Sequence, residues 1–313
     1  MTKLDSYQLT YRLFAFIIFC SIFSAFASYR LHLDSFIDLY SAGLEEIING
    51  VGRAPDQYRY LPYLFLDQIR HILTIIIGEN IEWKWPLITF EATFLALGLC
   101  SLVSYSSKHL DNLIIVLTTA LIYPFIMFDG VRSIAAFIFF MSCFLLFISK
   151  SSFLVGRREL FYSTLVAFSF TRADVAILVG LVAAHHMHYR IPEKLVVAAV
   201  PILAQILLMQ YIFPSAEYFS EVVMLKDNIS AIYIAGNPVT YLILGAMIAY
   251  WRKFSDFLAK MNQHHRFPLI LCIGYIVTIF IVGRVNEYRL FLPFLPIFYS
   301  IWPIESNSRF LGR

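Results

Sequence analysis

The chain has 313 residues, of which 59% are hydrophobic and 14% are charged, and its mean hydropathy is +0.72. So few polar residues cannot cover a water-soluble globule of this size, and the composition therefore predicts an integral membrane protein. The net charge is only +3, and basic residues alternate with acidic ones instead of forming a basic arm, so we expect no nucleic acid partner. The four cysteines show no CxxC spacing, which argues against a disulfide framework or a zinc site.

Apolar stretches recur along the whole chain. A membrane span needs about 20 apolar residues, and fewer where a helix is broken or the bilayer is thinned. In chain order the predicted spans are 11–29, 86–107, 112–128, 133–149, the short pair 159–170 and 175–188, then 195–214, 238–251, 267–283 and 290–304. The first stretch ends without a small-residue cleavage site, so we expect it to be retained. We predict an all-α fold, a polytopic transmembrane helical bundle of about 9–11 membrane helices built as a single domain over 1–313.

Lys and Arg residues set the predicted orientation, because loops rich in them stay on the cytoplasmic side. Three loops are rich in them: 150–158, 190–194 and 252–266. If all three are cytoplasmic, the outer face receives a large first loop and three short charged segments: 30–85, 129–132, 171–174 and 284–289. Within that first loop, residues 60–78 are apolar but contain Asp67, Arg70 and His71, so we expect an amphipathic helix on the outer face.

The first outer loop carries a motif with acids, aromatics and small residues. Asp34 and Asp38 are four residues apart, so on a helix both carboxylates share one face. They are followed by Tyr40, Gly43, Gly50 and the segment Tyr58-Arg59-Tyr60-Leu61-Pro62. Residues 33–62 resemble the membrane glycosyltransferases of the GT-C superfamily, in particular the branches that use polyprenol-phosphate-mannose. The chain departs from that pattern in having no Pro-Tyr dipeptide after Gly50 and in being shorter than most members.

The resemblance implies sugar transfer from a polyprenyl-phosphate carrier, with Asp34 as the base and Asp38 as its alternative. The chemistry agrees, because transfer to a hydroxyl needs a carboxylate that takes the proton. It also needs cations for the departing phosphate, and the planar fork of an arginine such as Arg59 suits this role. The competing interpretation is that the two acids cap a surface helix and that Arg59 reaches the membrane surface between two interfacial tyrosines.

Three further charged segments interrupt apolar stretches on the same predicted side. Charges at membrane depth are costly unless they line a polar cavity, which favours substrate binding, although self-contained ion pairs are the alternative for each segment. The candidate catalytic residues are Asp34 and Asp38, and the candidate substrate-binding residues are Tyr58, Arg59, Arg132, Arg172, Asp174, Arg284, Glu287 and Arg289. Asp129 accompanies Arg132 in the first of these segments.

No cofactor or metal site is defined by the sequence. His185, His186, His188, His264 and His265 lie at predicted cytoplasmic helix ends without acids at ligand spacing, so interfacial packing is favoured over metal binding. A divalent metal remains compatible with the carboxylates of the outer loop.

The favoured function is a glycosyltransferase of the bacterial inner membrane whose active site faces the periplasm. Its partners would be a polyprenyl-phosphate-linked sugar donor, a glycan or glycolipid acceptor, and membrane lipid. One alternative is a polysaccharide polymerase that joins lipid-diphosphate-linked repeat units. The other is a transporter or flippase of an anionic lipid, in which the arginines bind the ligand but no base is needed.

Overall fold

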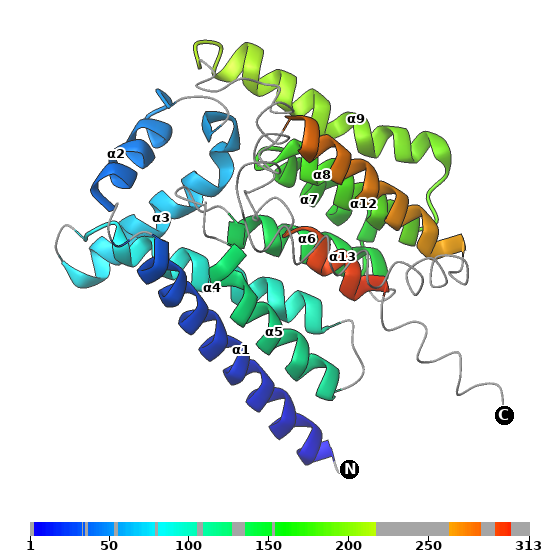
Figure 1. The fold of residues 1–313 in the computed structure, drawn as a ribbon, viewed down its shortest axis with the longest axis horizontal. Helices are drawn as coiled ribbons and strands as arrows, with labels where there is room; N and C mark the ends of the chain where they lie inside the picture. The colour runs from blue at the N-terminus through cyan, green and yellow to red at the C-terminus, as the bar shows by residue number, and fades with distance from the viewer. Residues whose placement is uncertain are drawn as a thin grey trace, which may run out of the picture.

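The computed structural model describes residues 3–32, 34, 37–52, 56–78, 81–104, 109–126, 135–151, 154–216, 263–282 and 292–301. These residues form helices and turns, with no strand among them (Figure 1). Three helical segments are long and apolar enough to cross a membrane: Tyr11–Leu31, Lys84–Val103 and Ile191–Ile212. The all-helical fold and the presence of span-length apolar helices are therefore as predicted from the sequence.

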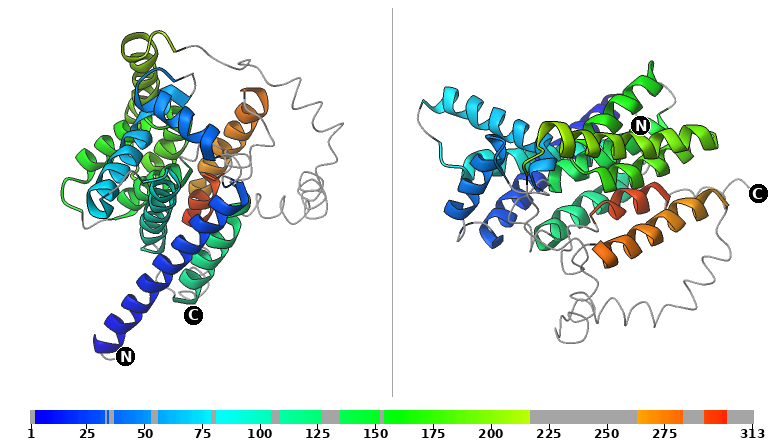
Figure 2. Two further views of the ribbon diagram at one scale, coloured as in Figure 1. Left: turned by 90° about the vertical axis from the view of Figure 1, so that its left-hand side faces the viewer. Right: turned by 90° about the horizontal axis from the view of Figure 1, so that it is seen from above.

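The N-terminal part is a group of three packed helices. Helix α1 (Lys3–His32) contacts both α4 (Lys84–Val103) and α5 (His109–Ile126), and Figure 2 shows α1 and α5 side by side. A row of buried serines, Ser21, Ser24 and Ser28, lies on α1, and the Ser24 hydroxyl donates a hydrogen bond to the Ala120 carbonyl at 3.0 Å. Small residues let helix backbones approach closely, which explains this tight contact.

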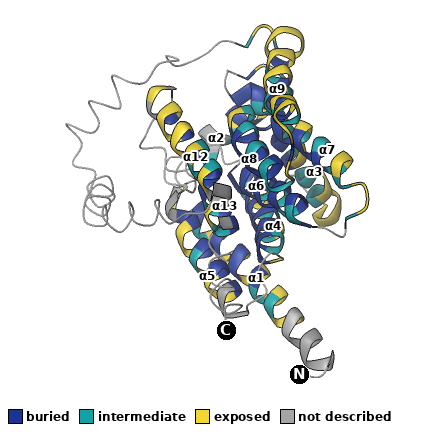
Figure 3. Ribbon diagram, turned by 90° about the vertical axis from the view of Figure 1, so that its right-hand side faces the viewer, coloured by how far each residue is buried: buried dark blue, intermediate teal, exposed yellow. Residues whose placement is uncertain are grey.

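Helix α6 (Ala135–Lys150) occupies the centre of the molecule. It packs against α4 on one side and against α7 (Arg157–Ser169), α8 (Ala173–His186) and α13 (Phe294–Ile301) on others. Its contact with α4 is lined by aromatic rings, such as Phe94 and Phe137, whose centroids are 4.7 Å apart. Figure 3 shows that the buried surface runs through α4, α6 and α8. This continuous core positions the segments that carry the candidate site.

The C-terminal part adds two helices with exposed apolar faces. Helix α9 (Ile191–Leu207) continues into a π-helical turn, η3 (Leu208–Ile212), and packs on α7 and α8. Helix α12 (Gln263–Val282) packs on α8. Much of both helices is coloured as exposed in Figure 3, and the exposed residues include the large apolar Leu195, Leu203 and Ile270. Such surfaces suit contact with lipid.

The first loop folds into a short helix, a 3₁₀ turn and a longer amphipathic helix. These are α2 (Ile37–Ile48), η1 (Asp56–Arg59) and α3 (Tyr60–Ile77). One face of α3 buries Tyr63 and Leu66, whereas Ile72, Ile75 and Ile76 are exposed. The predicted amphipathic helix in 60–78 is thus confirmed as a helix, and it is not among the span-length apolar helices. Its position on the outer face stays a prediction.

Most predicted spans coincide with helices, although several helices are short. Stretches 133–149 and 267–283 correspond to α6 and α12, and the pair 159–170 and 175–188 corresponds to α7 and α8 joined by a tight turn. In the stretch 290–304 the described residues form α13 up to Ile301, and 302–304 and 238–251 lie outside the described residues.

Candidate anion-binding site

The turn between α7 and α8 presents an arginine and an aspartate that are clamped together. Arg172 is extended, with φ −160° and ψ 95°, and it is the residue that precedes the first turn of α8, where Asp174 lies. Arg172 Nε donates to Asp174 Oδ1 at 3.0 Å and Arg172 Nη2 donates to Oδ2 at 2.9 Å. The arginine side chain is only 11% exposed, and that of Asp174 is 43% exposed. Two parallel charge-assisted hydrogen bonds fix the plane of the guanidinium group, and the helix N-terminus stabilises the carboxylate.

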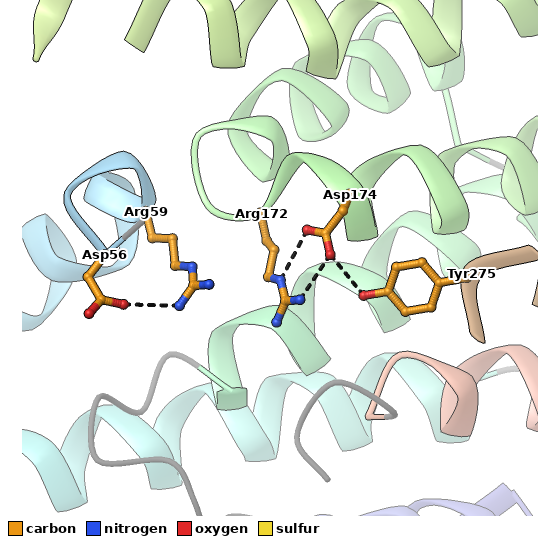
Figure 4. Close-up of polar contacts among 5 residues, drawn as sticks. All are labelled: Asp56, Arg59, Arg172, Asp174 and Tyr275. Carbon is orange, nitrogen blue, oxygen red and sulfur yellow. Dashed lines mark hydrogen bonds and ion pairs between the residues drawn. The ribbon is translucent and has the colours of Figure 1, made fainter. Parts of the chain in front are cut away.

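A tyrosine from α12 completes this cluster. Tyr275 is buried, and its hydroxyl donates a hydrogen bond to Asp174 Oδ2 at 3.0 Å. Figure 4 shows the three side chains in a row, with Asp174 between Arg172 and Tyr275. Residues of α8 and α12 therefore act jointly to hold Arg172 in place.

A second arginine–aspartate pair lies in η1. Arg59 Nη1 donates to Asp56 Oδ1 at 3.1 Å, and both side chains are largely buried. The turn that carries them is fixed by Gln57, whose side chain accepts a hydrogen bond from the Gly52 amide and donates one to the Ile47 carbonyl. The loop before η1 is thereby tied to the end of α2.

The two pairs face each other, although they come from distant parts of the chain. The Leu61 amide donates to the Phe170 carbonyl at 3.4 Å, which joins the start of α3 to the α7–α8 turn. Arg59 is close enough for its positive charge to stabilise the Asp174 carboxylate. In Figure 4 both guanidinium groups lie between the two carboxylates. The four side chains are formally neutral together, and an anion can draw on two preoriented guanidinium groups, which suits a phosphate.

Tyr58, the neighbour of Arg59 in η1, contacts residues that follow α9. Its ring packs against Leu208 at the end of α9, and its hydroxyl donates to the Ala216 carbonyl at 3.2 Å. Tyr58 is 5% exposed, and these contacts hold it in place beside Arg59, while its predicted role in substrate binding stays a prediction.

The contacts of Asp34 connect it to a different group of residues. Arg30, one helical turn earlier, donates a hydrogen bond to Asp34 Oδ2, and the Asp34 amide bonds to the Tyr29 carbonyl at 3.1 Å. The hydrogen bond from Arg30 lowers the pKa of the Asp34 carboxyl below its ordinary value, and the positive charge of Lys84 acts in the same direction. Asp34 is therefore a carboxylate at neutral pH, held by Arg30 and not by Arg59 or Arg172.

The remaining predicted site residues are not placed. Asp38 belongs to α2, but its side chain falls outside the described residues, as do Arg132, Arg284, Glu287 and Arg289. Among the predicted residues that are described, the structure brings together Arg59, Arg172 and Asp174.

Sequence reasoning missed two members of the cluster, Asp56 and Tyr275. Asp56 has a usable signal, because it precedes Arg59 by three residues at the start of a helical segment. Tyr275 gives a weaker one as a single tyrosine within an apolar helix, a position where its hydroxyl needs a partner.

Another polar cluster lies toward the other end of α3. The Arg70 guanidinium stacks over the Trp83 ring at 4.2 Å and pairs with Glu45 at 3.5 Å, and Trp83 Nε1 donates to Glu45 Oε1 at 3.3 Å. These contacts tie α2, α3 and the start of α4 together. From the sequence, Arg70 only argues against a membrane span in 60–78.

The histidines at the other end of α8 take part in packing contacts. His185 Nδ1 lies 3.5 Å from Lys194 Nζ, and its ring lies 4.8 Å from that of Phe267. Within the described part of the chain, no three His, Cys, Asp or Glu side chains gather into a group that could hold a metal ion. The side chains of His264 and His265 are outside it.

No known protein-family model, curated protein or solved structure matches this chain. The resemblance to the GT-C enzymes therefore rests on residues 33–62 alone, and the function must be argued from the site.

Proposed function

We propose that the protein is a glycosyltransferase of the bacterial inner membrane that takes a sugar from a polyprenyl-phosphate carrier. The observation that carries this proposal is that Arg59 and Arg172 lie on two turns joined by a hydrogen bond, with each guanidinium group paired to its own aspartate (Figure 4). Sugar transfer from such a carrier leaves a lipid-linked phosphate, whose negative charge grows as the glycosidic bond breaks. Two preoriented guanidinium groups stabilise that charge without reorganising during the reaction.

The burial of the cluster supports a ligand role. The arginine side chains are only 19% and 11% exposed, and largely buried charges are stable only when they are paired. Asp56 and Asp174 supply that pairing before any ligand binds. A phosphate that meets this cluster encounters N–H donors at fixed positions, in surroundings where each hydrogen bond is stronger than in water.

The proposed architecture extends beyond the three span-length helices. The shorter apolar helices α5, α6, α8 and α12 would cross the bilayer together with them and with segments outside the described residues, giving the predicted bundle of about 9–11 membrane helices. Cytoplasmic placement of the Lys- and Arg-rich loops then puts Arg172 on the periplasmic side. The acceptor would be a glycan or glycolipid that approaches from there.

Asp34 and Asp38 are the proposed alternatives for the base, on the strength of the family resemblance. Since Asp34 is a carboxylate at neutral pH, it can accept a proton when an acceptor hydroxyl is placed beside it. A low pKa makes it a weak base, so its contribution would come mainly from position.

A second candidate is the polymerase that joins lipid-diphosphate-linked repeat units. The observation in its favour is that the guanidinium groups of Arg59 and Arg172 face each other (Figure 4). Two such groups could bind the two phosphates of a diphosphate, one arginine to each phosphate. The two enzymes differ in the lipid that they bind, so the phosphate number of the preferred ligand separates them.

Ligand titration tests the proposal directly. The full-length protein in lipid nanodiscs would be titrated with farnesyl phosphate, farnesyl diphosphate and farnesol, as the wild type and as Arg59→Gln and Arg172→Gln. We expect each substitution to weaken farnesyl phosphate binding by about tenfold or more, because charge-assisted hydrogen bonds are lost. Farnesol binding should not change.

Arg158→Gln is the matched control, because Arg158 pairs with Glu193 and stacks on Tyr189, away from the cluster. Tighter binding of the diphosphate would favour the polymerase. Sugar transfer and lipid binding would also be measured for Asp34→Asn and Asp38→Asn. Loss of transfer with retained lipid binding supports the enzyme, because a transporter needs no base. Unchanged phosphate binding in both arginine variants would refute the proposed function.

A further inference from the structure

A hydrogen-bonded chain of three side chains connects α12 to the candidate phosphate site. Tyr275 donates to Asp174, and Asp174 accepts two hydrogen bonds from Arg172. We propose that Tyr275 is a positioning residue for phosphate binding, which acts on Arg172 through Asp174. This inference rests on the proposed function, because it assumes that Arg172 meets the lipid phosphate.

The geometry shows how Tyr275 can orient Arg172 through the carboxylate oxygen that both residues contact. Asp174 Oδ2 accepts from both the Tyr275 hydroxyl, at 3.0 Å, and Arg172 Nη2, at 2.9 Å. The terminal torsion of an aspartate has broad, roughly two-fold preferences, so a single partner does not fix the carboxylate plane. The second partner does, and the plane of the carboxylate then sets the plane of the guanidinium group.

Tyr275 is anchored by packing in the core, whereas Asp174 is held mainly by its hydrogen bonds. The tyrosine is 7% exposed, and its ring meets that of Phe294 edge to face, with centroids 5.7 Å apart. The Asp174 side chain is 43% exposed and therefore has room to rotate. The anchored hydroxyl thus gives the more exposed carboxylate a fixed hydrogen-bond partner.

The hydroxyl also has an electrostatic effect on the arginine. A carboxylate that accepts a hydrogen bond from a tyrosine shares part of its negative charge with that donor. It then neutralises the guanidinium group less completely, which leaves more positive charge for an incoming phosphate. Both effects predict weaker phosphate binding when the hydroxyl is removed.

The experiment is a double-mutant cycle on the full-length protein in nanodiscs. Dissociation constants for farnesyl phosphate and for farnesol would be measured for the wild type, Tyr275→Phe, Asp174→Asn and the double variant. Tyr275→Phe removes one oxygen and keeps the ring, so thermal unfolding should show that the fold is retained. We expect farnesyl phosphate to bind about tenfold more weakly to Tyr275→Phe, with farnesol unaffected.

The cycle separates positioning from packing. If Tyr275 acts through Asp174, Tyr275→Phe in the Asp174→Asn background should change the affinity for farnesyl phosphate by less than about twofold. The reason is that the Asp174 carboxylate, through which Tyr275 acts on Arg172, is already absent. A merely structural tyrosine would give the same loss in both backgrounds. Tyr162→Phe is the matched control, because Tyr162 stacks on Tyr189 and is outside this hydrogen-bonded chain.

The outcomes distinguish this inference from the proposed function. Equal losses in the two backgrounds, or no loss in Tyr275→Phe, would overturn the positioning role while leaving phosphate binding by Arg172 in place. If the wild-type protein binds farnesyl phosphate no better than farnesol, the proposed function fails and the inference fails with it.

Discussion

The contact between α4 and α6 depends on a glycine, which makes a quantitative prediction of stability possible. A Cβ atom added to Gly98 would lie 2.6 Å from Phe139 Cδ1 and 3.2 Å from Phe140 Cα. Phe139 is fully buried, and the Cα atom belongs to the helix backbone, so neither can move aside without separating the helices. We therefore expect Gly98→Ala to force α4 and α6 apart.

The magnitude follows from two opposing terms. Overpacking of a well-packed core costs about 1–3 kcal/mol. Replacing glycine by alanine in a helix returns about 1 kcal/mol of helix propensity. Gly98→Ala should thus lower the free energy of unfolding by about 1 kcal/mol, within a range of roughly 0–2 kcal/mol. Gly274→Ala in α12 is the matched control, since nothing lies within 4 Å of its added Cβ, and it should leave stability equal or higher.

Buried cysteines provide the assay. The thiols of Cys20, Cys143 and Cys272 are buried, so a thiol-reactive fluorophore in detergent solution reports unfolding as they become accessible. For a chain of this size about 1 kcal/mol corresponds to about 2 °C in the melting temperature. The two alanine variants should therefore melt at temperatures separated by several degrees. If Gly98→Ala melts at or above the temperature of Gly274→Ala, α4 and α6 do not approach each other at this glycine.

Three further predictions concern the charged residues. Because the hydrogen bond from Arg30 lowers the pKa of Asp34, the carboxylate should stay ionised until the pH falls through that lowered value, so Arg30→Gln should move the acid limb of the pH–rate profile for sugar transfer to higher pH. Arg172→Lys keeps the positive charge but loses the planar fork, so titration should show a farnesyl phosphate affinity between that of the wild type and that of Arg172→Gln. Arg70→Gln removes the stacking on Trp83 and should lower the free energy of unfolding by about 0.5–1 kcal/mol, measured by the same melting assay.

Most of the longer helices could be predicted from the sequence because they follow apolar stretches, whereas α2 and η1 follow none. Helix α6 begins and ends within two residues of the predicted span 133–149, and the turn between α7 and α8 falls at the predicted charged segment. Helix α13 begins at Phe294, four residues after the start of the predicted stretch 290–304, since hydropathy marks membrane-compatible sequence without fixing where a helix begins.

The candidate site was only partly predictable. Arg172 and Asp174 were recognisable as a local pair, and the pairing of Arg30 with Asp34 is also encoded by their helical spacing. The approach of Arg59 to Asp174 was not, because it depends on the tertiary contact between Leu61 and Phe170. No local pattern encodes a contact between segments so far apart in the sequence.

The lengths of α7 and α8 bear on how the charged turn would bind a lipid phosphate in the proposed function. Their 13 and 14 residues span about 20 Å each, which is less than the ~30 Å hydrocarbon core. In the proposed orientation, a hairpin of two such helices entering from the cytoplasmic side ends below the periplasmic surface. Non-helical backbone is tolerated at that depth only where protein or a polar cavity surrounds it, and Thr171 in the turn is fully buried. A phosphate bound by Arg172 would therefore be drawn below the membrane surface, where fewer water molecules compete for the guanidinium group and each charge-assisted hydrogen bond is stronger.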